Sequence, residues 1–189
     1  ANADRHAVLQ ALRQRHARRR ADHMGHQGRI RRRRHDDRRG EAEAIAQSCP
    51  SMDGISPQNY YFAPNGNSVK YKNRKANQPQ VFGTWPDFAK VNNRSLDKGR
   101  FLDESNERFA TMSCVVGADI AASLFEDEDP VGQSIRINSS LFEVVGVFEK
   151  VKSSFGNDNL NRAVAIPLST FEKMYPWEKK LFLQSRARS

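Results

Sequence analysis

Residues 117–150 have the sequence GADIAASLFEDEDPVGQSIRINSSLFEVVGVFEK, which predicts a short helix, an acidic turn and a β-hairpin. Ile120 and Leu124 are four residues apart, with Ala121 and Phe125 beside them. A helix of about two turns would therefore cover a sheet with one apolar stripe. No catalytic group stands out in this stretch, so the pattern is typical of a scaffold.

The helix is expected to end near Phe125, because four acidic residues follow it at positions 126–129. Carboxylates at a helix C-terminus oppose the macrodipole, and Pro130 cannot continue the hydrogen-bond ladder. The acidic residues are therefore assigned to a loop.

Strand patterns lie on both sides of this helix. Residues 112–116 alternate with period two and predict a strand that has one polar-tolerant face. Residues 134–138 and 142–148 alternate in the same way, and the Asn-Ser-Ser sequence at 138–140 supplies a turn between them.

The rest of the chain favours an α+β fold, with small mixed sheets, short covering helices and two lobes. Further strands are predicted at residues 60–63, 68–71, 80–84, 163–166 and 181–183, and short helices at 41–47, near 85–88 and after 169. Ser169 and Glu172 have the spacing of a capping box. Asp103, Glu104 and Glu107 are expected on the surface, and Trp85 and Phe88 in the core rather than in a ligand platform.

Positive charge is concentrated in residues 1–40. This segment holds 13 arginines, no lysine and 4 acidic residues, whereas residues 41–189 hold 18 basic and 18 acidic side chains. All five histidines lie in the same segment, which has no aromatic residue. We therefore divide the chain into an arginine- and histidine-rich arm at 1–40 and a neutral domain at 41–189.

Three interpretations of the arm compete. It could neutralise nucleic-acid phosphates, most densely at Arg31 to Arg34, or hold a metal ion at His23 and His26. The favoured interpretation is a disordered or irregular solvated arm with too little apolar surface to fold. A further hypothesis is that the arm is not native sequence, because its composition resembles GC-rich DNA read out of frame.

Four ordered stretches resemble the periplasmic core domain of MacB-like ABC transporter permeases, a group related to FtsX. They are LDKGRFLDE (96–104), CVVGADIAASLF (114–125), DPVGQSIRINSSLFEVVGVFEK (129–150) and AVAIPLSTFEKMYPW (163–177), with weaker resemblance in AEAIAQSCPSMDGISP (42–57). The resemblance implies that residues 41–189 form such a core domain, incomplete at both ends.

What the resemblance implies about function is a non-catalytic extracytoplasmic domain. It would lie on the periplasmic side of the inner membrane and couple an ATP-driven conformational change to substrate export or to a periplasmic partner. The implied partners are an ABC ATPase domain or subunit, reached through membrane helices missing from this sequence, a periplasmic adaptor protein, and a second copy in a dimeric transporter. The alternative from another class is a nucleic-acid-binding protein that uses the arm, and the neutral body makes it the weaker one.

Enzymatic chemistry is not expected. No histidine lies outside the arm, so the body cannot build a Ser-His or Cys-His nucleophile, and no phosphate-binding glycine loop is present. Asp127 and Asp129 could serve as an acid/base or calcium pair, but a solvated turn is the more common meaning of such a run. No catalytic, cofactor-binding or metal-binding residue is therefore assigned.

Two features stay open in the sequence. Cys49 and Cys114 could pair in an oxidising periplasm, although two buried free thiols are favoured. The polar loop at 153–162 is the best candidate for a tip that faces a partner, against the alternative of a plain surface loop.

Overall fold

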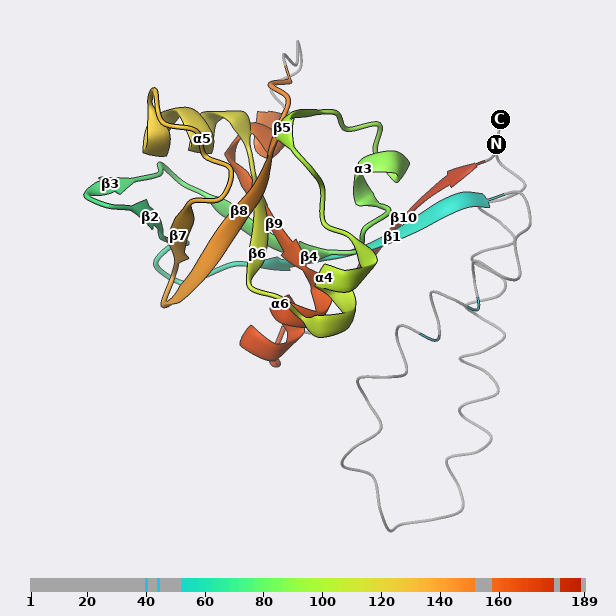
Figure 1. The fold of residues 1–189 in the computed structure, drawn as a ribbon. Coiled ribbons are helices and arrows are strands. Elements are labelled where there is room, and N and C mark those ends of the chain that lie inside the picture. The colour runs from blue at the N-terminus through green and yellow to red at the C-terminus, as the bar shows by residue number, and fades with distance from the viewer. Residues whose placement is uncertain (1–39, 41–43, 45–51, 152–157, 179–180, 188–189) are drawn as a thin grey trace, which may run out of the picture. The chain divides into compact units, whose positions relative to one another are not determined.

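The computed structural model describes residues 40, 44, 52–151, 158–178 and 181–187. Nearly all of its elements belong to one compact unit, residues 53–186. The strands of this unit form one ten-stranded mixed sheet in the order β10-β1-β4-β9-β6-β8-β7-β2-β3, with β5 paired to β8 beside this path (Figure 1). The predicted α+β class, with mixed strand pairing and short helices, is confirmed, and the strands expected in separate small sheets are joined into one.

The strands are β1 (Met52–Tyr61), β2 (Val69–Tyr71), β3 (Arg74–Lys75), β4 (Gln80–Thr84), β5 (Leu96–Gly99), β6 (Ser113–Val116), β7 (Ser134–Ile137), β8 (Ser140–Phe148), β9 (Ala163–Pro167) and β10 (Phe182–Ala187). The helices are α3 (Phe88–Val91), α4 (Glu104–Phe109), α5 (Ala118–Phe125) and α6 (Leu168–Met174), with a 3-10 helix, η2 (Asp158–Arg162).

The centre of the sheet is buried on both faces. Every residue of β6 and β9 is buried, and alternate residues of these strands belong to two separate apolar clusters. Cys114 and Val116 pack in one cluster, and Val115 packs in the other. The strand predicted at 112–116 is confirmed as β6, and its polar residue, Ser113, is accommodated by a hydrogen bond from the Thr111 hydroxyl at 3.1 Å and not by solvent.

The predicted hairpin and its covering helix are confirmed. Helix α5 ends at Phe125, and β7 pairs antiparallel with β8. Asn138 occupies the turn with a positive φ of 52°, a conformation that asparagine tolerates better than most residues. Its side-chain oxygen also accepts the N–H of Ser68 at 2.9 Å, so the turn is held to the start of β2.

The capping box predicted at Ser169 and Glu172 is wrong. Pro167 occupies the N-cap of α6, and the backbone N–H of Ser169 donates to both carboxylate oxygens of Glu107, each at 3.2 Å. The Ser169 hydroxyl donates to the Glu107 carbonyl. Glu107 is therefore buried, with 5% of its surface exposed, and is not the surface residue that the sequence predicts.

Strand β1 begins at Met52, well before the predicted residue 60. Polar residues at 56, 58 and 59 hide its apolar pattern, yet all three are buried and hydrogen-bonded to neighbouring elements. Of the helix predicted at 41–47, only Ala44 is described, and it is helical. The other residues of that helix lie outside the described part of the chain.

Glu107→Ala is expected to lower the free energy of unfolding by about 1–2 kcal/mol, because it removes the acceptor for an N–H in the first turn of α6. Glu107→Gln keeps one acceptor oxygen and should lose less. Glu104→Ala is the matched control, since Glu104 is exposed on the same helix and should change stability by about 0.5 kcal/mol or less. Urea denaturation measures all three, and equal losses at positions 104 and 107 would contradict the assignment.

Candidate functional site

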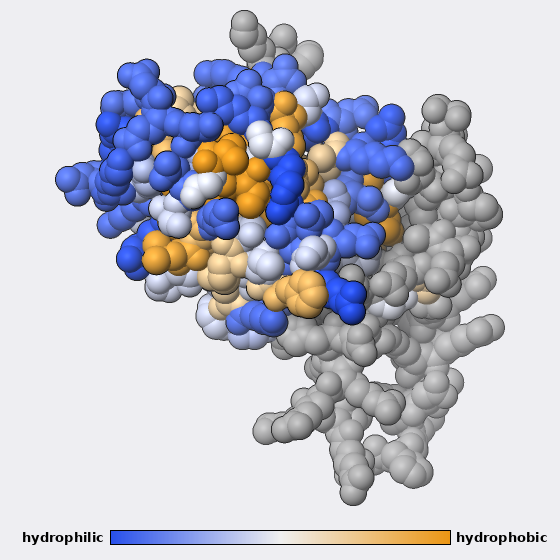
Figure 2. Space-filling model, viewed as in Figure 1, coloured by the Kyte–Doolittle hydropathy of each residue, from blue (hydrophilic) through white to orange (hydrophobic). Residues whose placement is uncertain are grey.

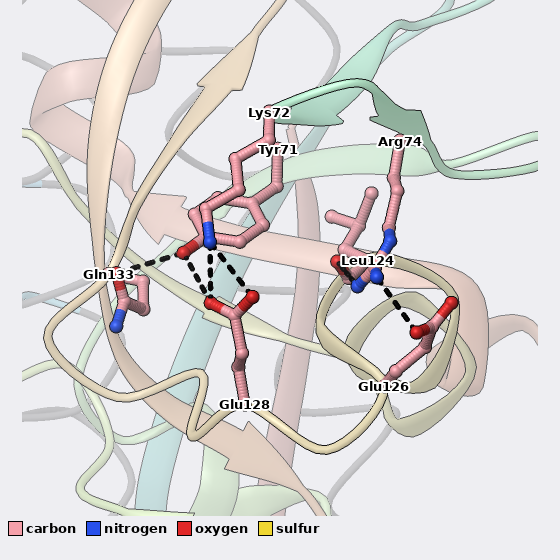
Figure 3. A network of polar contacts seen from close by, with 7 residues as sticks. All are labelled: Tyr71, Lys72, Arg74, Leu124, Glu126, Glu128 and Gln133. Carbon is pink, nitrogen blue, oxygen red and sulfur yellow. Dashed lines mark hydrogen bonds and ion pairs between the residues drawn. The ribbon is translucent and has the colours of Figure 1, made fainter.

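A network of ion pairs joins the acidic turn after α5 to the β2–β3 hairpin (Figure 3). Lys72 Nζ lies 2.8 Å and 2.9 Å from the two carboxylate oxygens of Glu128, and Arg74 Nη2 lies 2.8 Å from Glu126 Oε2. The Tyr71 hydroxyl is 2.9 Å from Glu128 Oε2. We call these five residues the acidic clamp.

The acidic clamp fixes the edge of the sheet to the end of α5. Arg74 Nη1 also donates to the carbonyl of Leu124 at 3.1 Å, and so provides a partner for one of the acceptors that a helix leaves unpaired at its C-terminus. The hydrogen bond from Lys72, and then that from Tyr71, lower the pKa of Glu128. The hydrogen bond to Glu128 in turn raises the pKa of Lys72.

The two aspartates of this turn have a different place. Asp127 and Asp129 are exposed, and Asp129 lies 3.7 Å from Lys98 Nζ and accepts the N–H of Val131 at 3.3 Å. Within the described ranges, no group of three histidine, cysteine, aspartate or glutamate side chains is placed to hold a metal ion. The turn makes ion pairs and hydrogen bonds to neighbouring segments of the chain.

Cys114 lies at the centre of the sheet as a free, fully buried thiol. Burial, with a smaller contribution from Glu143, raises the pKa of this thiol far above its usual range, so it stays protonated and unreactive. The predicted buried free thiol is thus confirmed at Cys114, while Cys49 lies outside the described residues.

Four large apolar side chains are exposed on or next to α4, α6 and the start of β8, and we call them the apolar rim. They are Phe109 (67% exposed), Met112 (41%), Leu141 (55%) and Trp177 (63%). Two hydrogen bonds bring these elements together, because the backbone carbonyl of Met112 accepts from Glu143 and that of Thr111 accepts from Thr170. In Figure 2, apolar side chains on the visible face lie in patches among hydrophilic ones.

The aromatic pair at 85 and 88 divides between core and surface. Phe88 is buried, and its ring centroid lies 5.1 Å from that of Phe82 and 5.8 Å from that of Phe101. Trp85 is half-buried. The assignment to the core therefore holds for Phe88.

Of the loop predicted to face a partner, residues 153–157 lie outside the described part of the chain. The remaining residues, 158–162, form η2, and Asn161 there is buried. Its side chain bonds both backbone groups of Val151, at 3.0 Å and 2.8 Å, which closes the base of the loop. The arm candidates His23, His26 and Arg31 to Arg34 also lie outside the described residues.

The sequence matches the family described as MacB-like periplasmic core domain over residues 6–187. The macrolide export ATP-binding/permease protein MacB of Vibrio parahaemolyticus is 27% identical over 124 residues, which are 66% of this chain and 18% of that protein. The pyoverdine export ATP-binding/permease protein PvdT of Pseudomonas aeruginosa is 33% identical over 89 residues, 47% of this chain and 13% of that protein. The chain thus spans less than a fifth of the length of either relative.

Solved structures share the fold. The periplasmic region of MacB from Actinobacillus actinomycetemcomitans has a TM-score of 0.65 at 16% identity, over 82% of this chain and 71% of that one. The extracellular domain of the noncanonic ABC-type transporter YknZ from Gram-positive bacteria has a TM-score of 0.62 at 12% identity, over 79% and 72%. Among the described residues, no helix is both long and apolar enough to span a bilayer. The chain belongs to the MacB-like periplasmic core domain family.

Proposed function

We propose that this chain is the extracytoplasmic part of an ABC-type export permease, and that it carries conformational change between the membrane and the periplasm without a chemical step of its own. Its partners would be an ABC ATPase domain or subunit, reached through membrane helices, and a periplasmic adaptor, in a transporter that holds two copies. The location would be the periplasmic side of the inner membrane.

The observation that carries this proposal is the pairing of β1 with β10 at one edge of the sheet (Figure 1). The Gln58 side chain on β1 donates to Gln184 on β10 at 2.5 Å, which adds a side-chain link to the pairing. The chain therefore enters and leaves the compact unit through neighbouring strands. A domain with its two ends side by side can be inserted between two adjacent membrane helices without distortion.

The interior favours movement as a rigid body. Strands β1, β4, β9, β6 and β8 are neighbours in one sheet, so a displacement at β1 and β10 is transmitted through backbone hydrogen bonds to the far side. The acidic clamp holds β2 and β3 to α5 at that side. Packed cores of this kind shift as units rather than deform continuously.

The apolar rim is our candidate for the adaptor contact, because exposed Trp, Phe and Met side chains are typical of interface centres. The division of the chain at residue 41 also remains a proposal, since the family match extends into the arm as far as residue 6. The relatives' names suggest a macrolide and a pyoverdine as first substrates to test.

The acidic clamp should open in acid. Because the folded-state pKa of Glu128 is lowered, its contribution is present above the ordinary glutamate value of about 4.3 and is lost as the pH falls through the lowered folded value. Below about pH 4 we therefore expect lower amide-exchange protection factors in β2 and β3, and Glu128→Gln should show this lower protection already at pH 7. Asp127→Asn, on the same exposed turn, is the control and should leave the exchange unchanged.

Replacing residues 53–186 of the transporter that contains this chain with a short flexible linker should abolish export and leave basal ATP hydrolysis intact. The adjacency of β1 and β10 makes this replacement possible without separating the flanking segments. Export of the two candidate substrates and ATP hydrolysis are measured in proteoliposomes. Export that continues at the wild-type rate would refute the proposed function.

Leu141→Ser combined with Trp177→Ser should weaken binding of the adaptor at least about tenfold, since exposed apolar anchors carry much of an interface's affinity. Leu183→Ser is the matched control, because Leu183 is 40% exposed on β10, outside the rim. Surface plasmon resonance with the adaptor measures all variants. An equal loss at Leu183, or none at the rim, would place the contact elsewhere.

A further inference from the structure

A groove of about 370 Å³ lies beside the paired strands β1 and β10. This volume is within the range of small-molecule sites. Phe82 and Phe88 line it as buried rings, and Phe62 (67% exposed) and Phe182 (50%) stand exposed along it. Tyr60 joins the two pairs, with its ring centroid 5.5 Å from that of Phe82 and 5.7 Å from that of Phe182. The groove therefore offers aromatic faces and edges to a flat apolar group.

One positively charged residue shares the lining of the groove with these rings. Arg94 is the single charged residue among those that line the groove, and its Nε atom is buried with no hydrogen-bond partner. A guanidinium stays charged in a protein, so the unpaired donor cannot be removed by loss of a proton. Buried polar groups are nearly always paired in folded proteins, so an unpaired arginine donor in a groove indicates a missing acceptor.

The neighbouring amides do not supply that acceptor. Gln58 accepts from the Tyr60 hydroxyl at 2.6 Å and donates to Gln184, so these three side chains form a chain of their own. Asn92 donates to the carbonyl of Phe88 at 2.9 Å. Gln58, Gln184 and Asn92 are thus paired with other groups, and the Nε–H of Arg94 is left without an acceptor.

We propose that this groove binds an aromatic carboxylate, whose ring packs against Tyr60, Phe82 and Phe182 and whose carboxylate accepts from Arg94. A carboxylate matches the planar donor geometry of a guanidinium better than a neutral acceptor does. The site goes beyond the coupling role, because binding to this groove requires neither the membrane nor ATP.

A second groove provides an internal contrast. It has a volume of about 490 Å³ and lies between the turn after β1, the β7–β8 turn and the end of α6. Its lining includes Tyr61, Tyr175 and Trp177 but no charged residue. Aromatic lining alone therefore occurs twice in this domain, and the unpaired arginine distinguishes the groove beside β1 and β10.

The test compares naphthalene-2-carboxylate with the uncharged naphthalene-2-carboxamide on the full 189-residue chain. We expect the carboxylate to bind at least about tenfold more tightly by isothermal titration calorimetry, because hydrogen bonds to charged groups are the strong ones. The Nε–H resonance of Arg94, assigned by its loss in Arg94→Gln, should shift on titration with the carboxylate.

Arg94→Gln should bring carboxylate affinity down to that of the carboxamide and leave carboxamide binding unchanged, which also shows that the variant folds. Arg136→Gln removes the same charge from an exposed position on β7, outside the groove, and should bind as the wild type does. Equal affinity for the two probes, no binding of the carboxylate, or an unshifted Nε–H signal would each overturn the proposal. A domain that does not bind the carboxylate could still take part in export. A negative binding result would therefore overturn the proposed groove site and leave the export experiment as a separate test of the proposed function.

Discussion

The structure depends on the burial of β6 and β9 between two apolar clusters. Each of these strands needs cover on both faces, and the cover comes both from α5 and α6, which directly follow them, and from segments far away in the sequence. Helix α5 and η2 meet at Gly117, where a Cβ would approach the backbone oxygens of Leu160 and Asn161 to 2.3 Å. Only a glycine allows the chain to pass from β6 into α5 at so close a distance, so the cover of the sheet and the sequence at 117 are coupled.

Polar ties hold the outer elements to this core. Glu107 joins α4 to α6, Asn161 closes the loop after β8, and the acidic clamp joins β2 and β3 to α5. The tie at Glu107 is buried and only weakly screened by salt, whereas the clamp is exposed and is weakened by salt. The sheet centre and α6 are therefore expected to be the least mobile parts, and the β2–β3 edge the part most sensitive to conditions.

Local patterns in the sequence predict the elements well where one helix or hairpin has its own signal. Residues 118–125 and the turn at 138–140 are examples, because the apolar spacing and the turn residues act within a few positions. Features that depend on partners distant in the sequence could not be predicted. The sequence around Glu107 is typical of the surface, and only the packing of α6 beside it explains its burial. The amides of β1 make that strand look polar, and they can be buried because their partners lie more than a hundred positions away.

The groove could not be predicted from the sequence for the same physical reason. Arg94 has no local motif around it, and the aromatic residues beside it come from β1, β4, α3 and β10, which only the sheet order brings together. Residues of β1 and β10, the strands through which the chain enters and leaves the unit, are among those that line the groove. A ligand that packs against Tyr60 and Phe182 would contact β1 and β10 at once, and would thereby favour the position of β10 in which both contacts are made. Movement at the membrane and occupancy of the groove would then be linked through the same pair of strands.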